Sequence, residues 1–260
     1  MSRAKKGMDD GRERKPRSDK GTIQATNRDM YCIAWIAEQY AARADQIRRL
    51  LSRFPDPDRP FKGRLIAETT TRDQIERWKK AGWIEYERVL AAQPGYAWVT
   101  RKGLQLVELD EEYTARKPAG TRLQHIYAVN QLRLFLDLKY AWKSERRYRW
   151  QQAQLTQGGK SKKGKKGGPI PDGVLTSREG DIAVEAEITP KKPADLEAKI
   201  ASLVGAYPPD DYMKDSPIFA RVWFYVPNAR MEEAVKEACQ SLEDKESVRV
   251  GLGVNDTLLG

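Results

Sequence analysis

Apolar and polar residues recur every three to four positions over most of the first 117 residues. This spacing is typical of helices that bury one face, whereas shorter apolar runs bounded by Gly or Pro favour strands. The expected elements are helices at 27–41, 44–54 and 71–80, a short strand near 64–67, strands at 83–90 and 96–100, and a helix that begins at Arg101. Asn27 is the expected N-cap of the first helix, Thr71 and Gln74 form a capping box, and Gly82 ends the third helix.

After Pro118-Ala119-Gly120 the pattern changes to longer elements. The expected elements are a long helix at 121–142, a strand at 147–155, a hairpin at 173–188, a helix at 194–207, a strand at 219–226, a helix at 231–242 and a strand at 247–250. The run FARVWFYV is almost entirely apolar, which indicates a strand covered on both faces. The predicted class is therefore mixed α/β (α+β), with the order α-β-β-β-α-β-α-β in this second part.

The hairpin carries the strongest candidate chemistry. Ile182, Val184, Ala186 and Ile188 alternate with acidic residues, so Glu185 and Glu187 fall on the opposite face, with Asp172 at the base of the first strand. Converging carboxylates of this kind hold Mg²⁺ or Mn²⁺, and such a metal activates water against a phosphodiester. The alternative is an ordinary hairpin with an acidic face in solvent.

Pro171-Asp172 and Glu185-Ala186-Glu187 resemble the PD-(D/E)xK nuclease signature. The resemblance implies that Asp172, Glu185 and Glu187 form the metal and catalytic site. The chain departs from that signature, because Glu187 occupies the position of the lysine that orients or activates water. Lys191 or Lys192, at the start of the next helix, is the candidate for a displaced lysine. Glu145 fits the extra acidic residue that many of these enzymes supply from their first helix, or it belongs to an exposed charge cluster with Lys143, Arg146 and Arg147.

The order of three helices and a hairpin in residues 25–117 resembles a winged helix-turn-helix domain, with Val99-Thr100-Arg101-Lys102-Gly103 closing the wing. In that resemblance the helix at 71–80 is the recognition helix and binds the major groove of double-stranded DNA. The predicted DNA-binding residues of this part are Arg72, Gln74, Arg77, Lys79, Lys80 and, on the wing, Arg88. The alternative is a winged helix that binds another protein.

The net charge of +10 is concentrated in two segments. Residues 1–20 carry eight Lys or Arg against four acids, and GGKSKKGKKGG at 158–168 carries five lysines and no acid. We expect residues 1–24 to be a flexible basic tail and 157–168 a flexible loop, because neither has enough apolar residues to offset the entropy of ordering. The lysines expected to contact DNA phosphates are Lys160, Lys162, Lys163, Lys165 and Lys166. A purely solubilising role is the alternative.

Cysteine, histidine and apolar content exclude several classes. Two distant cysteines and one histidine, His125, argue against a disulfide framework and a Cys/His zinc site. No apolar run is long enough to cross a membrane, and the first twenty residues are too polar for a secretion signal. We therefore expect a cytoplasmic protein without membrane contact. His125 is expected to be a structural hydrogen-bonding residue, with contact to nucleic acid or a leaving group as the alternative.

One family combines both parts. The replication-relaxation proteins of actinobacterial plasmids, phages and integrative elements resemble this chain over roughly residues 25–228. The matching residues are His125 and Asn130, Trp142 and Glu145, Pro171-Asp172-Gly173, Glu185-Ala186-Glu187, and Lys191. The resemblance implies a DNA-associated role in replication, relaxation or transfer of a mobile element.

The expected protein is thus a winged helix at 25–117 that locates DNA, followed by a nuclease-fold domain at 118–260 that nicks or cleaves it. The alternative is a catalytically inactive nuclease fold acting as a replication accessory protein or transcriptional regulator. A tyrosine relaxase is a third alternative, disfavoured because one histidine cannot form the histidine cluster of such enzymes. The sequence leaves open whether the protein binds other replication or transfer proteins and whether it forms a homodimer.

Overall fold

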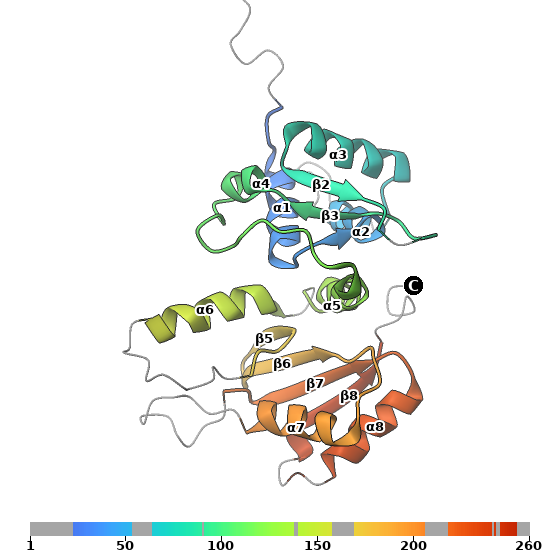
Figure 1. Cartoon of the computed structure of the whole chain (residues 1–260), viewed down its shortest axis with the longest axis vertical. Coiled ribbons are helices and arrows are strands. Elements are labelled where there is room, and N and C mark those ends of the chain that lie inside the picture. Colours follow the sequence, from blue (N-terminus) through green and yellow to red (C-terminus); the bar gives the residue numbers. More distant parts are fainter. Residues whose placement is uncertain are drawn as a thin grey trace, which may run out of the picture.

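The computed structural model describes residues 23–53, 64–89, 91–137, 140–157, 169–205, 218–240, 242 and 245–253. Its elements are mixed α and β and form two sheets (Figure 1). We call residues 23–117 the first half and residues 118–253 the second half. The helices and strands of the first half are α1 (Asn27–Glu38), β1 (Ala42–Arg43), α2 (Ala44–Arg53), α3 (Glu68–Ala81), β2 (Ile84–Glu87), β3 (Tyr96–Val99) and α4 (Arg101–Leu106).

The expected helices of the first half are confirmed, with corrections at their starts. The N-cap of α1 is Thr26 and not Asn27, and Thr26 forms a capping box with Asp29. α3 begins three residues before Thr71, so the expected capping box is wrong; the Thr71 hydroxyl bonds to the Ala67 carbonyl inside the helix. Its end at Gly82 is as expected, because Gly82 adopts the left-handed conformation (φ 75°) that glycine tolerates best. The strand expected near 64–67 is absent from those described residues.

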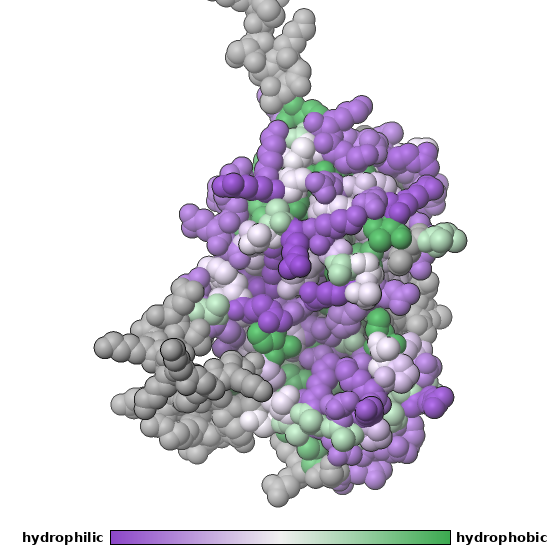
Figure 2. Space-filling view, in the orientation of Figure 1, coloured by the Kyte–Doolittle hydropathy of each residue, from purple (hydrophilic) through white to green (hydrophobic). Residues whose placement is uncertain are grey.

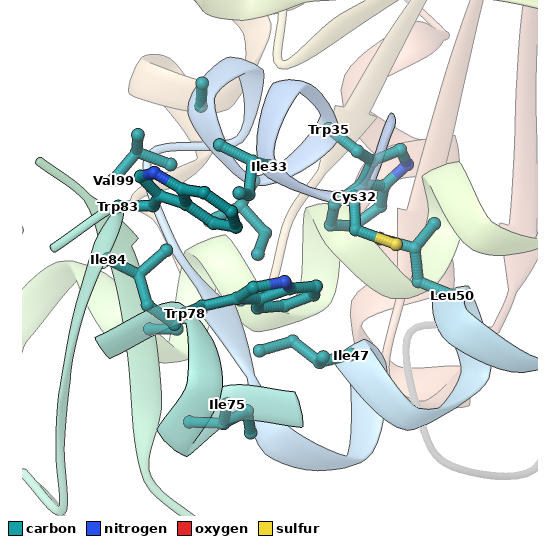
Figure 3. Close-up of a cluster of buried hydrophobic side chains, with 14 of the residues drawn as sticks. Cys32, Ile33, Trp35, Ile47, Leu50, Ile75, Trp78, Trp83, Ile84 and Val99 are labelled. Carbon is teal, nitrogen blue, oxygen red and sulfur yellow. The ribbon is translucent and has the colours of Figure 1, made fainter. Parts of the chain in front are cut away.

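The first sheet has the order β1-β3-β2, with both neighbouring pairs antiparallel. Helices α1, α2, α3 and α4 pack with it around one core, part of which Figure 3 shows. Trp78 of α3 lies at the centre of this core and is fully buried, with Ile33 of α1 and Ile47 of α2 around it (Figure 3). Burying an indole of this size contributes much of the stability of a small domain.

The second half contains α5 (Leu123–Leu136), β4 (Ala141–Ser144), α6 (Glu145–Gln157), β5 (Gly173–Ser177), β6 (Gly180–Ala186), α7 (Pro193–Val204), β7 (Arg221–Val226), α8 (Ala229–Cys239) and β8 (Val248–Leu252). Short 3₁₀ turns lie at Gly120–Arg122 and Lys245–Ser247. The sheet order is β4-β5-β6-β7-β8. β4, β5 and β6 are antiparallel, whereas β6, β7 and β8 are parallel and are connected through α7 and α8.

The region 137–157 corrects two expectations. The helix expected to reach Trp142 is already complete at Leu136, and the first strand is Ala141–Ser144, which pairs with β5. The strand expected at 147–155 is instead the helix α6. Tyr148 and Trp150 are aromatic residues of the kind enriched in strands, but they pack from α6 into the cores of the two different halves, and Glu145 pairs with Arg149 one turn later. Tertiary packing outweighs strand propensity here.

α5 joins the two halves. One of its faces covers the second sheet, where Ala128, Leu132 and Leu136 pack on β5 and β6. Its other residues face the first half, where Leu123 and Ile126 pack with Tyr96 and Trp98 of β3. Figure 1 shows α5 between the two sheets, while α7 and α8 cover the other face of the second sheet.

Buried hydrogen bonds also cross this joint. Asn130 of α5 donates to the Ala41 carbonyl (2.8 Å), and Arg133 pairs with Glu38 of α1 (2.8 Å). Since unpaired buried polar groups are costly, these bonds hold the halves in one arrangement. The expected boundary at residue 118 therefore separates two sheets but not two independent cores.

Hydrophilic side chains cover most of the visible face of both halves, with only small separate hydrophobic patches (Figure 2). Among the described residues no helix is long and apolar enough to cross a membrane.

Candidate active site and nucleic-acid surface

The acidic hairpin brings Asp172 beside the end of β6. The antiparallel register pairs Gly173 with Val184, so Asp172 lies opposite Glu185. The backbone N–H of Ala186 donates to Asp172 Oδ2 (2.9 Å), which fixes the carboxylate at this edge. The alternation predicted from the sequence is confirmed, because Ile182, Val184 and Ala186 pack toward α5 and the acidic residues lie on the other face, toward α7.

Glu185 is 2 % exposed. Its Oε2 lies 2.7 Å from Nζ of Lys199, while Oε1 is buried and has no hydrogen-bond partner among the described residues. Burial raises the pKa of Glu185 well above its usual range, the charge of Asp172 raises it further, and Lys199 counteracts both. A buried carboxylate with one unpaired oxygen beside a second carboxylate favours a bound cation.

Glu187 is also buried, at 4 % exposure. Its Oε2 accepts from Lys191 and, at 3.3 Å, from Lys199, and the role of Lys191 as a displaced lysine stays a prediction. The alternative of an acidic face in solvent is therefore wrong. Buried carboxylates need cationic partners, and here α7 and the residues just before it supply them.

Lys199 is the main site residue that the sequence analysis missed. It projects from α7 toward both Glu185 and Glu187. Burial alone lowers the pKa of Lys199, but the charges of Glu185 and Asp172 raise it above the ordinary value. A signal was present in the sequence, because Lys199 lies three residues after Leu196 and four before Leu203, on the apolar stripe of the helix.

His125 of α5 completes the cluster from the other side. Its Nε2 lies 2.8 Å from Asp172 Oδ1. Burial alone lowers the pKa of His125, but the hydrogen bond and charge of Asp172 outweigh it and raise the pKa. Burial alone raises the pKa of Asp172, but His125 and Lys199 hold it below the usual range. The expectation of a structural hydrogen-bonding role fits this contact, which also places an imidazole at the edge of the acidic cluster.

Glu145 lies next to this cluster but faces arginines. It is the first residue of α6 and not part of the preceding helix, and its backbone N–H donates to the Asp172 carbonyl (3.2 Å). Its side chain pairs with Arg149 (2.7 Å) and Arg122 (3.4 Å). A cavity of about 10 Å³, which has room for about one water molecule, is lined by both halves, including Tyr40, Arg122, His125, Glu145 and Asp172.

A metal ion fits these residues in part. Among the described residues no group of three or more His, Cys, Asp or Glu side chains is placed to hold a metal. The unpaired Oε1 of Glu185, opposite Asp172, is nevertheless an oxygen that lacks a positive partner. Among the described residues Oδ1 of Asp172 bonds to His125 and Oδ2 to the Ala186 N–H, and a carboxylate oxygen has two lone pairs. Asp172 and Glu185 are therefore the two carboxylates that would hold such an ion.

Of the side chains expected to contact DNA, two bond to a buried carboxylate. Gln74 and Arg77 of α3 both donate to Asp29 of α1, at 2.8 and 2.8–2.9 Å, and Asp29 is fully buried. Trp78 Nε1 donates to the same carboxylate (2.8 Å). Hydrogen bonds to a charged group such as the buried Asp29 carboxylate are stronger than bonds between neutral groups. Gln74 and Arg77 therefore hold α3 against α1.

Arg72 and Arg88 line a concave groove of about 760 Å³ between α2, α3 and the turn after β2. Arg48 lies in the same groove, and three acids, Asp45, Glu68 and Glu76, balance the three arginines. Lys79 pairs with Glu76 (2.9 Å), while Lys80 is exposed. The groove is thus of mixed charge rather than uniformly basic.

The remaining expected DNA contacts, Lys160, Lys162, Lys163, Lys165 and Lys166, lie outside the described residues, as do residues 1–22 of the basic tail. No protein-family model, curated protein or solved structure matches this chain.

Proposed function

We propose that the protein binds double-stranded DNA and cleaves or nicks it with Mg²⁺ or Mn²⁺ in the replication, relaxation or transfer of a mobile element. The observation that carries this proposal is the buried cluster of Asp172, Glu185 and Lys199, in which one Glu185 oxygen has no partner in the part of the chain that the structure describes. Such a metal supplies Lewis acidity and activates water for attack on a phosphodiester.

The arrangement of elements supports the two domain types. The proposed winged helix is supported by helices α1 to α3 and a three-stranded antiparallel sheet of order β1-β3-β2. The proposed nuclease fold of the PD-(D/E)xK type, in which the acids lie on the second and third strands, is supported by α5 and the sheet β4-β5-β6-β7-β8.

The proposal gives each side chain of the cluster a role. Asp172 and Glu185 would hold the metal, and Lys199, between Glu185 and Glu187, would take the place of the lysine that Glu187 displaces from the motif. Lys199 then stabilises negative charge that develops on the phosphate. Lys191 holds Glu187, and His125 orients Asp172 through its hydrogen bond.

A nicking assay on supercoiled plasmid tests the proposal. We expect Asp172→Asn and Glu185→Gln to abolish nicking while duplex binding is kept. Asp181→Asn, on the same hairpin but with a side chain that accepts from Thr176 and lies outside the cluster, is the matched control and should keep its activity. Mg²⁺ or Mn²⁺ should raise the melting temperature of the native protein and not of Glu185→Gln, because a ligand that binds only the folded state stabilises it.

A non-catalytic DNA-binding protein is the second candidate. It is favoured by the lysine pairing of Glu187 and by the lack of a three-ligand group among the described residues. Absence of both nicking and metal-induced stabilisation in the native protein, with duplex binding intact, would establish this second function in place of the first.

The groove between α2, α3 and the turn after β2 is the proposed DNA surface. We expect Arg72→Glu and Arg88→Glu to weaken duplex binding in the full chain, whereas Arg101→Glu, exposed on α4 and outside the groove, should have little effect. Equal loss in all three variants would instead indicate a nonspecific effect of net charge.

A further inference from the structure

A cluster of arginines lies at the joint of the two halves, next to the acidic site. Arg122, in the turn before α5, and Arg149 of α6 share the single carboxylate of Glu145, at 3.4 and 2.7 Å. Their side chains are 49 % and 58 % exposed, whereas that of Glu145 is 17 % exposed. Two guanidinium groups thus face solvent around one carboxylate, which leaves an excess of positive charge.

Arg146 adds a third positive charge. It donates to the carbonyls of Ala37 and Thr114, both at 2.6 Å, and within the described ranges no carboxylate forms an ion pair with it. Burial lowers the pKa of Arg146, as expected where its charge lacks an anionic partner. We call Tyr40, Arg122, Glu145, Arg146 and Arg149 the arginine notch.

Tyr40 forms the wall of the notch. The guanidinium carbons of Arg122 and Arg146 each lie 5.1 Å from the centroid of the Tyr40 ring. Its backbone has φ 67°, in the left-handed region that a tyrosine adopts at a cost of about 1 kcal/mol or more. The strained backbone places the ring between the two arginines, where it orients their planar groups.

The notch adjoins the acidic cluster. Tyr40, Arg122 and Glu145 line the same small cavity as His125 and Asp172. The backbone of Glu145 is also bonded to that of Asp172. An anion held by Arg122 and Arg149 therefore lies beside the proposed cleavage site.

We propose that the arginine notch binds a phosphate group of a nucleic-acid strand, and that Glu145 occupies the two exposed guanidinium groups until the phosphate replaces it. A guanidinium donates two parallel hydrogen bonds to a phosphate as it does to a carboxylate, and a phosphate brings more acceptor oxygens. This inference rests on the proposed function for the identity of the strand, but binding at the notch needs neither metal nor cleavage.

Calorimetric titration of the full chain in EDTA tests this, with inorganic phosphate and with one short oligodeoxynucleotide carrying either a 5′-phosphate or a 5′-hydroxyl. We expect Arg122→Gln and Arg149→Gln each to weaken phosphate binding about tenfold, the effect of losing one charge-assisted hydrogen bond. Arg116→Gln, an exposed arginine outside the notch, makes the same charge change and should not alter binding. Glu145→Gln should strengthen binding, since it removes the competing carboxylate.

The two oligonucleotides identify the source of the phosphate. Tighter binding of the 5′-phosphorylated strand, lost in Arg122→Gln, shows that the notch takes a strand end; equal binding of both strands, weakened by Arg122→Gln, shows that it takes a backbone phosphate. Unchanged affinity in Arg122→Gln and Arg149→Gln, or weaker binding in Glu145→Gln, overturns the proposal. Because the titration contains no metal, loss of nicking in the Asp172 and Glu185 variants has no bearing on this result.

Discussion

Replacing Lys199 by Met tests the electrostatics of the buried acidic cluster most directly. The change keeps an unbranched side chain of similar length and removes the charge that lies 2.7 Å from Glu185 and 3.3 Å from Glu187. Two carboxylates that are 2 % and 4 % exposed then lose a shared cation. Lys191 still contacts Glu187, so the loss of the Lys199 charge destabilises the buried Glu185 carboxylate most.

The expected loss is about 3 kcal/mol in the free energy of unfolding at neutral pH. Breaking a buried ion pair by removing one partner costs about 3–5 kcal/mol, and the lower end applies because Lys199 is 27 % exposed and Glu185 can take up a proton. For a chain of this size such a loss lowers the melting temperature by about 6–12 °C.

The loss should grow as the pH rises. Burial and Asp172 hold the pKa of Glu185 above its unfolded value, and without Lys199 this pKa rises further. A carboxyl whose folded pKa is raised contributes stability at pH below its unfolded pKa and loses it as the pH rises through the folded pKa. The free energy of unfolding of Lys199→Met should therefore be closest to that of the native protein near pH 5 and furthest below it near pH 9.

The assay is urea unfolding of both proteins at pH 5, 7 and 9 in EDTA, followed by tryptophan fluorescence. Lys192→Met, an exposed lysine just before α7, is the matched control and should unfold like the native protein. Adding Glu185→Gln to Lys199→Met should remove most of the pH dependence. A destabilisation of the same size at all three pH values would refute the reasoning, because it would indicate lost packing rather than an uncompensated carboxylate.

Three further predictions concern the rest of the fold. Asp29→Ala should lower the free energy of unfolding by about 3 kcal/mol in urea titrations, because it leaves three donors of α3, among them the fully buried Trp78, without their acceptor; a loss under 1 kcal/mol would contradict this. Gly173→Ala should cost about 1–3 kcal/mol by the same measurement, since a Cβ there would lie 2.2 Å from the Trp142 ring, and native-like stability would show that the ring moves aside freely. Cys32 should react with a thiol reagent only on unfolding, because it is buried and burial raises the pKa of its thiol; rapid labelling of the native chain would disagree.

Local pattern in the sequence was enough to predict the acidic hairpin and its faces. The period-two alternation from Ile182 to Ile188 is a property of the strand itself, and the turn residues before it set the register that brings Asp172 opposite Glu185. The apolar run of β7 and the glycine that ends α3 were predicted for the same reason. Each of these features depends on residues that are close to one another in the sequence.

Partners that are distant in the chain were decided by tertiary structure. His125 and Asp172 are 47 residues apart, and Asp29 and Arg77 are 48 apart, so no periodicity connects them. Arg77 and Gln74 have the composition of an exposed DNA-contacting face, but the buried Asp29 engages both.

The same reason explains the errors at 137–157 and the missed Lys199. Whether Ala141–Ser144 is a helix end or a strand depends on whether β5 is beside it, and whether 145–157 is a strand or a helix depends on the two cores that receive Tyr148 and Trp150. Lys199 on an apolar stripe is unfavourable within α7 alone. Its position becomes favourable only when the fold brings Glu185 and Glu187 to within ion-pair distance of its Nζ atom.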